Sequence, residues 1–217
     1  MIGVKICGIT NPKDALCAAE NGAAAVGLIF YPPSPRCVNP FQARAAIAAL
    51  PDHVVRVGVF VNEDEARVQD IYESCGLDMI QLHGDEPPEY CRSFATDRLI
   101  KAFALKTDKD LGRVDDYEVA AILVDTRHAG LYGGTGKTSD WELAKRVSRP
   151  LILSGGLKEE NAVEAFDIVR PGALDLNSGV EISPGRKDPE KIQRVMQKIA
   201  ALPAAGGPRI FTKRTNR

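Results

Sequence analysis

The stretch Lys5-Ile6-Cys7-Gly8-Ile9-Thr10 lies close to the N-terminus and sets the plan of the whole chain. The apolar alternation that precedes Cys7 predicts a β-strand with this thiol at its C-terminal end. Asn11 followed by Pro12 is typical of the start of a helix, with Asn11 as the N-cap. The first unit is therefore a strand over residues 3–7 followed by a helix over residues 12–21.

The same strand-then-helix plan recurs along the chain. Further strands are predicted at 24–30, 54–61, 79–82, 99–104, 119–124, 151–153 and 173–176. Further helices are predicted at 40–50, 62–76 with Asn62 as N-cap, 87–94, within 107–117, 140–147, 158–169 and 189–202. Strands that alternate with helices predict a parallel sheet, and eight units predict an α/β fold of one closed (β/α)8 TIM barrel. The rival is an open doubly wound sheet, but the glycine fingerprint expected after its first strand is missing.

Composition sets limits on the class of protein. The 217 residues are 44% hydrophobic and 26% charged, with a net charge of −1, so no global field attracts nucleic acid or a membrane. The five cysteines are odd in number and form no C-x-x-C motif, which favours a reducing, cytoplasmic location over disulfides or a zinc site. No signal peptide or membrane-spanning run is expected. Residues 1–202 are predicted to be the catalytic domain, and the Pro/Gly-rich, then basic, residues 203–217 a mobile, solvated tail rather than a nucleic-acid arm.

In a barrel of this kind the active site lies at the C-terminal ends of the strands. Ser154-Gly155-Gly156 follows the seventh strand and Asn177-Ser178-Gly179 follows the eighth. Glycines allow backbone N–H groups to approach phosphate oxygens, and phosphate sites of these barrels often use those two loops. The alternative is that each glycine only makes a tight turn. Two such loops in neighbouring units favour a phosphate site.

Several polar side chains at strand ends are candidates for catalysis. Cys7 is either a small buried hydrophobic residue or a thiolate base, which the charge of Lys5 on the same side of the strand would favour. Asp125 follows the sixth strand and either caps the next loop or acts as an acid opposite Cys7. Arg36, in a proline-stiffened loop, is suited to two-point binding of a carboxylate, unless it is a surface residue. His83 is either a base or a structural hydrogen-bonding residue.

The segment 133–138, Gly-Gly-Thr-Gly-Lys-Thr, does not fit a nucleotide-binding P-loop, because the required first glycine falls at Leu131. We expect this segment to be a mobile loop that closes over the substrate.

Eight motifs occur in a fixed order: K-I-C-G-I-T, F-Y-P-P-S-P-R, Q-L-H-G-D-E, L-V-D-T, G-G-T-G, D-W, L-S-G-G-L and D-L-N-S-G-V-E. Together they resemble the phosphoribosylanthranilate isomerases of tryptophan biosynthesis over residues 3 to about 200. The resemblance implies a TIM barrel that needs no cofactor and no metal. It implies an Amadori rearrangement of N-(5-phosphoribosyl)anthranilate to 1-(2-carboxyphenylamino)-1-deoxyribulose 5-phosphate.

The resemblance also assigns roles to residues. It implies that Cys7 is the general base and Asp125 the general acid, that Arg36 holds the anthranilate carboxylate, and that Asp175 contacts the sugar. It further implies that the loops at Gly155-Gly156 and Ser178-Gly179 hold the phosphate. We also expect His83 to contact the substrate. Relatives occur as monomers, as dimers or fused to a neighbouring enzyme, so we expect a monomer or homodimer.

Two departures from the family pattern concern the rim of the site. The family usually has Phe before the Asp-Trp pair, where this chain has Thr138-Ser139, and small or branched residues where it has Leu176-Asn177. Two other functions remain open. One is the histidine-pathway isomerase, which performs the same chemistry on a bisphosphate with a carboxylate pair. The other is a non-catalytic barrel that binds a phosphometabolite.

Overall fold

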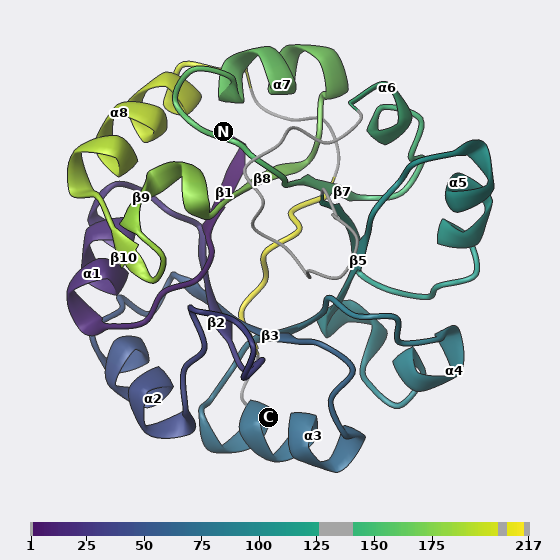
Figure 1. Cartoon of the computed structure of the whole chain (residues 1–217), viewed down its shortest axis with the longest axis horizontal. Coiled ribbons are helices and arrows are strands. Elements are labelled where there is room, and N and C mark those ends of the chain that lie inside the picture. Colours follow the sequence, from purple (N-terminus) through teal and green to yellow (C-terminus); the bar gives the residue numbers. More distant parts are fainter. Residues whose placement is uncertain (1, 126–140, 204–207, 215–217) are drawn as a thin grey trace.

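The chain folds into a closed barrel of eight parallel strands in the order β1 to β8, with β8 hydrogen-bonded to β1 (Figure 1). This computed structural model describes residues 2–125, 141–203 and 208–214. The strands are β1 (Gly3–Ile6), β2 (Ala25–Ile29), β3 (Val55–Phe60), β4 (Met79–Leu82), β5 (Leu99–Phe103), β6 (Ala121–Val124), β7 (Leu151–Leu153) and β8 (Ala173–Leu176). The predicted TIM barrel is confirmed.

Helices surround the barrel on its outside (Figure 1). They are α1 (Pro12–Glu20), α2 (Pro40–Ala48), α3 (Glu65–Ser74), α4 (Pro88–Cys91), α5 (Asp108–Val114), α6 (Trp141–Ala144), α7 (Ala162–Val169) and α8 (Pro189–Ala200). Short 3-10 helices lie at η1 (Thr96–Arg98) and η2 (Ser178–Val180), and a two-stranded hairpin joins β9 (Glu181–Ser183) to β10 (Arg186–Lys187). The hairpin and the 3-10 helices were not predicted.

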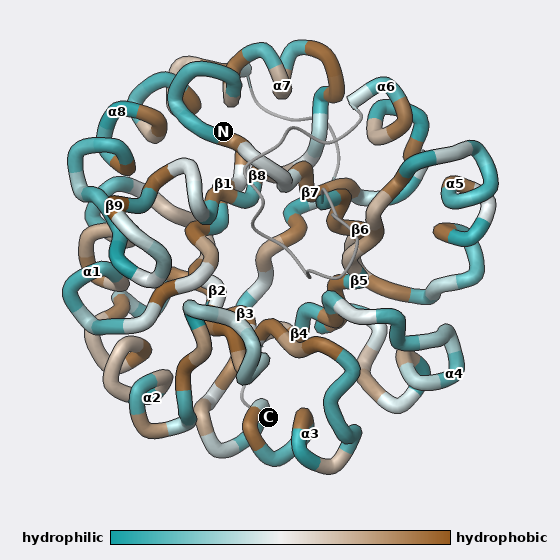
Figure 2. The backbone as a smooth tube through the Cα atoms, in the orientation of Figure 1, coloured by the Kyte–Doolittle hydropathy of each residue, from teal (hydrophilic) through white to brown (hydrophobic). Residues whose placement is uncertain are grey.

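The strands are buried on both faces, which explains their nearly continuous apolar sequences. All five residues of β2 are buried, and in Figure 2 the hydrophobic colour follows the strands, whereas the outer helices alternate between the two colours. Small and branched side chains such as Ala25, Val57, Ile100 and Leu123 fill the barrel interior. The interior is therefore a packed core, and buried polar side chains such as Lys5, Gln81 and Asp175 lie toward the C-terminal ends of their strands.

Capping and amphipathicity explain the helix positions. Asn11 accepts a hydrogen bond from the Asp14 amide at the start of α1, as predicted. The predicted cap Asn62 is wrong: Asp64 accepts from the Arg67 amide and starts α3. Asn62 instead adopts a φ of 48°, and its side chain accepts from the Asp85 amide, so it joins two loops.

The C-terminal segment 208–214 crosses the N-terminal end of the barrel (Figure 1, yellow). Ile210 and Phe211 are buried in the same cluster as the interior strand residues. A Cβ added to Gly3 would lie 3.2 Å from the Phe211 ring. The prediction of a mobile, solvated tail therefore does not hold for residues 208–214, because two apolar side chains close an end of the barrel that water would otherwise reach. The domain boundary at residue 202 stays a prediction.

Polar contacts hold this segment to the barrel. Lys213 Nζ lies 2.9 Å from Asp78 Oδ2, and the Arg214 amide donates to Asp78 Oδ1 over 3.0 Å. Arg98 donates to the carbonyls of Thr212 and Lys213. Within the described ranges, no helix is both long and apolar enough to cross a membrane.

Candidate active site at the C-terminal ends of the strands

The predicted strand-end residues gather at one end of the barrel. The amides of Cys7, His83, Asp125 and Ser154 each donate to the last carbonyls of a neighbouring strand, over 2.8 to 2.9 Å. The hydrogen-bond ladder of the sheet therefore fixes the backbone at all four positions. Since the strands are parallel, these side chains surround the same mouth, with Cys7 after β1 and Asp125 after β6.

Cys7 lies above a buried ion pair. Lys5 Nζ is 2.8 Å from Asp175 Oδ2, and the two residues are paired in register across β1 and β8. Burial raises the pKa of the Cys7 thiol, and the positive charge of Lys5 and its hydrogen bond oppose that rise. Burial also opposes the charged form of Lys5, but Asp175 and Cys7 outweigh it and raise the Lys5 pKa. A thiolate at Cys7 would thus form beside a protonated lysine.

Gly27 provides the space that Cys7 needs. A Cβ at Gly27 would lie 2.7 Å from Cys7 Sγ and 3.1 Å from Lys5 Cε. Any larger residue at this position of β2 would displace the thiol or the lysine, so the site depends on a glycine that sequence reasoning did not select.

Asp125 contacts His83 across the mouth. His83 Nε2 lies 3.2 Å from Asp125 Oδ2, and the other ring nitrogen, Nδ1, lies 2.7 Å from Gln81 Nε2. The loop that carries His83 is tied down by Glu86, a residue that the sequence analysis did not select. Glu86 accepts from the amides of Asn62 and Gly84 and pairs with Lys101 Nζ at 3.0 Å.

Arg36 is held in place by Glu181. Its Nε and Nη2 atoms donate to the Glu181 carboxylate in two-point geometry, with the shortest distance 2.7 Å. Burial opposes the charged form of Glu181, but Arg36 and Lys187 outweigh it and lower the Glu181 pKa. Lys187 Nζ reaches the same carboxylate at 2.9 Å. The expected surface alternative for Arg36 is excluded, because the residue is buried.

Arg36 also lies close to the residue that follows Cys7. A Cβ at Gly8, the residue after Cys7, would lie 2.8 Å from Arg36 Cδ. Glu181 and Lys187 belong to the β9–β10 hairpin, which sequence reasoning missed. Glu181 ends the last motif, D-L-N-S-G-V-E, but its partner is 145 residues away in the sequence, and no local pattern indicates that pairing.

The two glycine loops meet each other. Gly155 and Gly156 have φ values of 92° and 66°, which favour glycine. A Cβ at Gly179 would lie 2.0 Å from the Leu157 carbonyl oxygen, so only glycine allows the loops after β7 and β8 to touch. Ser178 begins η2 beside them. The structure thus brings Gly155, Gly156, Ser178 and Gly179 together.

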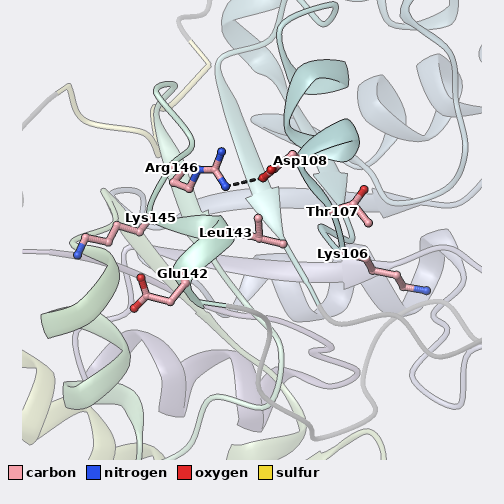
Figure 3. Close-up of a pocket in the computed structure, with 7 residues that line it drawn as sticks. All are labelled: Lys106, Thr107, Asp108, Glu142, Leu143, Lys145 and Arg146. Carbon is pink, nitrogen blue, oxygen red and sulfur yellow. Dashed lines mark hydrogen bonds and ion pairs between the residues drawn. The ribbon is translucent and has the colours of Figure 1, made fainter.

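Some predictions fall outside this arrangement. The glycine-rich loop 133–138, with its expected closure over the substrate, and the departure at Thr138-Ser139 lie outside the described residues. A surface pocket between α5 and α6 is lined by Lys106, Thr107, Asp108, Glu142, Leu143, Lys145 and Arg146. Figure 3 shows that Arg146 pairs with Asp108 there. The lining of this pocket includes none of the predicted site residues.

Comparison with known proteins identifies the family. Residues 4–198 match the family described as N-(5'phosphoribosyl)anthranilate (PRA) isomerase. The N-(5'-phosphoribosyl)anthranilate isomerase of Syntrophus aciditrophicus is 53% identical over 201 residues, which are 92% of this chain and 87% of that protein. The solved phosphoribosyl anthranilate isomerase from Thermotoga maritima is 46% identical, with a TM-score of 0.85 over 93% of this chain and 100% of that one.

A further solved structure shows a relative with a ligand. It is a phosphoribosyl anthranilate isomerase in complex with reduced 1-(o-carboxyphenylamino)-1-deoxyribulose 5-phosphate. It is 42% identical, with a TM-score of 0.82, and the match covers 93% of this chain and 100% of that one. The family match favours the predicted tryptophan-pathway isomerase over the histidine-pathway enzyme and over a non-catalytic barrel. With the barrel, the ordered motifs and these relatives in agreement, the chain belongs to the N-(5'-phosphoribosyl)anthranilate isomerase family.

Proposed function

We propose that this chain converts N-(5-phosphoribosyl)anthranilate to 1-(2-carboxyphenylamino)-1-deoxyribulose 5-phosphate by acid–base catalysis, with Asp125 as the acid and Cys7 as the base. One observation carries this proposal. A thiol beside a buried lysine and a carboxyl group held by a histidine lie at the same barrel mouth, after β1 and β6. Such a pair suits a reaction in which one proton is given and another is taken.

The side chains of Asp125 and Cys7 can give and take the protons that the proposed reaction requires. Asp125 gives its proton to the furanose ring oxygen, the bond between that oxygen and C1 breaks, and the anthranilate nitrogen supplies electrons to form an imine. The Cys7 thiolate then takes the proton from C2, and the C2–H electrons move toward the imine to give an enolamine. Tautomerisation of the enolamine gives the ketone. The buried thiolate is a stronger base than an exposed one, because burial raises its pKa.

The remaining residues hold the substrate. Glu181 occupies Nε and Nη2 of Arg36, and Nη1 makes no hydrogen bond with the described part of the chain, so Nη1 is available to the anthranilate carboxylate. Asp175 uses Oδ2 for Lys5, and Oδ1 is buried without a partner among the described residues, which favours a contact with a ribose hydroxyl. The amides of the loops at Gly155, Gly156, Ser178 and Gly179 hold the phosphate. His83 pairs with Asp125, so we assign it a role beside the acid as well as the predicted substrate contact.

Separate substitutions of the acid and of the base test these roles. We expect Cys7→Ser and Asp125→Asn each to lower kcat by on the order of 100- to 10,000-fold while leaving ligand affinity nearly unchanged. Binding of a reduced product analogue, measured by calorimetry, separates catalysis from binding. Full turnover in both variants would contradict the acid–base assignment.

The setting of the reaction is also proposed. We place the enzyme in the cytoplasm, as a monomer or homodimer that acts without nucleic acid, membrane, metal or cofactor. A dimeric relative is known from Thermotoga maritima. Light scattering after size-exclusion chromatography measures the mass in solution, and a higher assembly would contradict this part of the proposal.

A further inference from the structure

Gln81 is a buried polar residue inside the barrel. It belongs to β4 (Met79–Leu82) and has no exposed surface. Residues two apart on a strand share a face, so Gln81 lies between Met79, part of the apolar interior, and His83 at the mouth. A buried amide costs free energy unless it forms hydrogen bonds. The contact that Gln81 does form therefore needs an explanation.

That contact determines where the proton of His83 lies. Gln81 Nε2 is 2.7 Å from His83 Nδ1. With the amide in this orientation, its NH2 group donates, Nδ1 accepts through its lone pair, and the proton of the neutral imidazole is on Nε2. Nε2 lies 3.2 Å from Asp125 Oδ2. The Nε2–H group of the ring is therefore on the side that pairs with Asp125.

The same contact also bears on the doubly protonated ring. An imidazolium would direct its Nδ1–H at the amide NH2 of Gln81, so two donors would face each other. Asp175 from β8, whose own partner is Lys5, is one of the charged groups that interact with His83 and Asp125.

The position of the ring is fixed as well. The His83 amide donates to the Phe60 carbonyl over 2.8 Å. The next residue, Gly84, donates its amide to both oxygens of Glu86. Lys101 bonds the Gly84 carbonyl over 2.9 Å. Since the backbone on both sides is held, the ring presents its nitrogens to Gln81 and Asp125 in a set orientation.

We propose that Gln81 is a positioning residue that fixes the Nε2–H tautomer of His83, so that His83 donates to Asp125 Oδ2 and the acid proton of Asp125 resides on Oδ1. The catalytic half of this proposal rests on the proposed role of Asp125 as the general acid. The tautomer itself is independent of that role and can be observed without any reaction.

Nuclear magnetic resonance of protein labelled with [15N]histidine tests the tautomer directly. The chain has three histidines, His53, His83 and His128, and the spectrum of His83→Asn assigns the signals of His83. We expect an unprotonated Nδ1 and a protonated Nε2 in the unsubstituted protein. We expect a mixture of tautomers in Gln81→Met, and an Nδ1–H proton in Gln81→Glu, whose carboxylate accepts. The signals of the exposed His53 are the internal control.

Three results would overturn the tautomer assignment. The first is an Nδ1–H tautomer in the unsubstituted protein, as expected if the Gln81 carbonyl faced the ring. The second is an unchanged tautomer in Gln81→Met. The third is an imidazolium at neutral pH in the unsubstituted protein. The first and third measurements need no substitution at Gln81, so they decide the question even if the Gln81 variants fail to fold.

Steady-state kinetics tests the effect on catalysis. Gln81→Met keeps the volume of the side chain but removes its donor, and we expect kcat to fall about tenfold, less than for loss of the acid itself, with KM unchanged. Met79→Leu alters the same interior face one layer lower and serves as the matched control with unchanged kcat. Equal kcat in Gln81→Met and the unsubstituted enzyme would refute the catalytic half. Full activity of Asp125→Asn would instead refute the proposed function and leave the tautomer result standing.

Discussion

Phe211 offers the strongest test of how the C-terminal segment contributes to stability. Its side chain is 2% exposed and packs with Ile210 against the interior of the barrel. Truncation of a buried Phe to Ala costs about 3–5 kcal/mol in a closed core. The cost here is limited, because the chain end can detach once its anchor is lost, so we expect Phe211→Ala to lower the free energy of unfolding by about 2–4 kcal/mol.

Urea unfolding followed by far-ultraviolet circular dichroism measures this loss, and thermal unfolding provides a second measure. For a domain of this size, 1 kcal/mol corresponds to about 2–4 °C in Tm, so we expect Tm to fall by roughly 4–16 °C. The matched control is Phe41→Ala on α2, because Phe41 is 75% exposed. We expect that substitution to change stability by at most about 0.5 kcal/mol.

Measurements of activity show whether the C-terminal segment affects stability alone or catalysis as well. Phe211 lies at the N-terminal ends of the strands, opposite Cys7 and Asp125, so kcat/KM at 25 °C should be the same in both Phe variants and the unsubstituted chain. Equal unfolding free energies for Phe211→Ala and Phe41→Ala, within about 0.5 kcal/mol, would refute the packing of the segment under the barrel.

Three further substitutions test the site. Lys5→Met removes a positive charge that holds down the pKa of Cys7, so this pKa should increase. Because catalysis needs the thiolate, the pH at which kcat/KM increases should then be higher. An unchanged pH profile would contradict the role of the lysine. Glu181→Gln should raise KM about tenfold with little change in kcat, because Arg36 loses its charged partner; an unchanged KM would show that the pairing does not position the guanidinium. Gly179→Ala should weaken competitive inhibition by inorganic phosphate, because its Cβ would lie 2.0 Å from a carbonyl oxygen of the other loop, and an unchanged inhibition constant would place phosphate elsewhere.

Local patterns predicted the barrel well, because each unit carries its own signals. The Asn11-Pro12 pair fixes the start of α1, and the buried apolar run of β2 is unmistakable. The helix over 158–169 was predicted too long: α7 begins at Ala162. Lys158 and Asn161 instead form hydrogen bonds within the loop after β7. Such competition between loop and helix is not visible in propensities alone.

Long-range contacts could not be predicted from the same patterns. Ile210 and Phe211 are only two apolar residues in a basic segment, which gives no periodicity, although they complete the core. In the sequence, Gln81 is a single polar residue within an apolar strand. Its contact with His83 is visible only in the structure. The predicted positions of Cys7, Asp125 and the glycine loops, in contrast, follow from the rule that parallel strands end on one side.

The most direct test of the account is turnover of freshly made N-(5-phosphoribosyl)anthranilate by the purified chain, with a metal chelator present. Loss of the anthranilate fluorescence of the substrate follows the reaction in real time. The account predicts conversion at an enzymatic rate, undiminished by the chelator and abolished in Cys7→Ser. A folded chain that leaves this substrate unchanged would contradict the central claim.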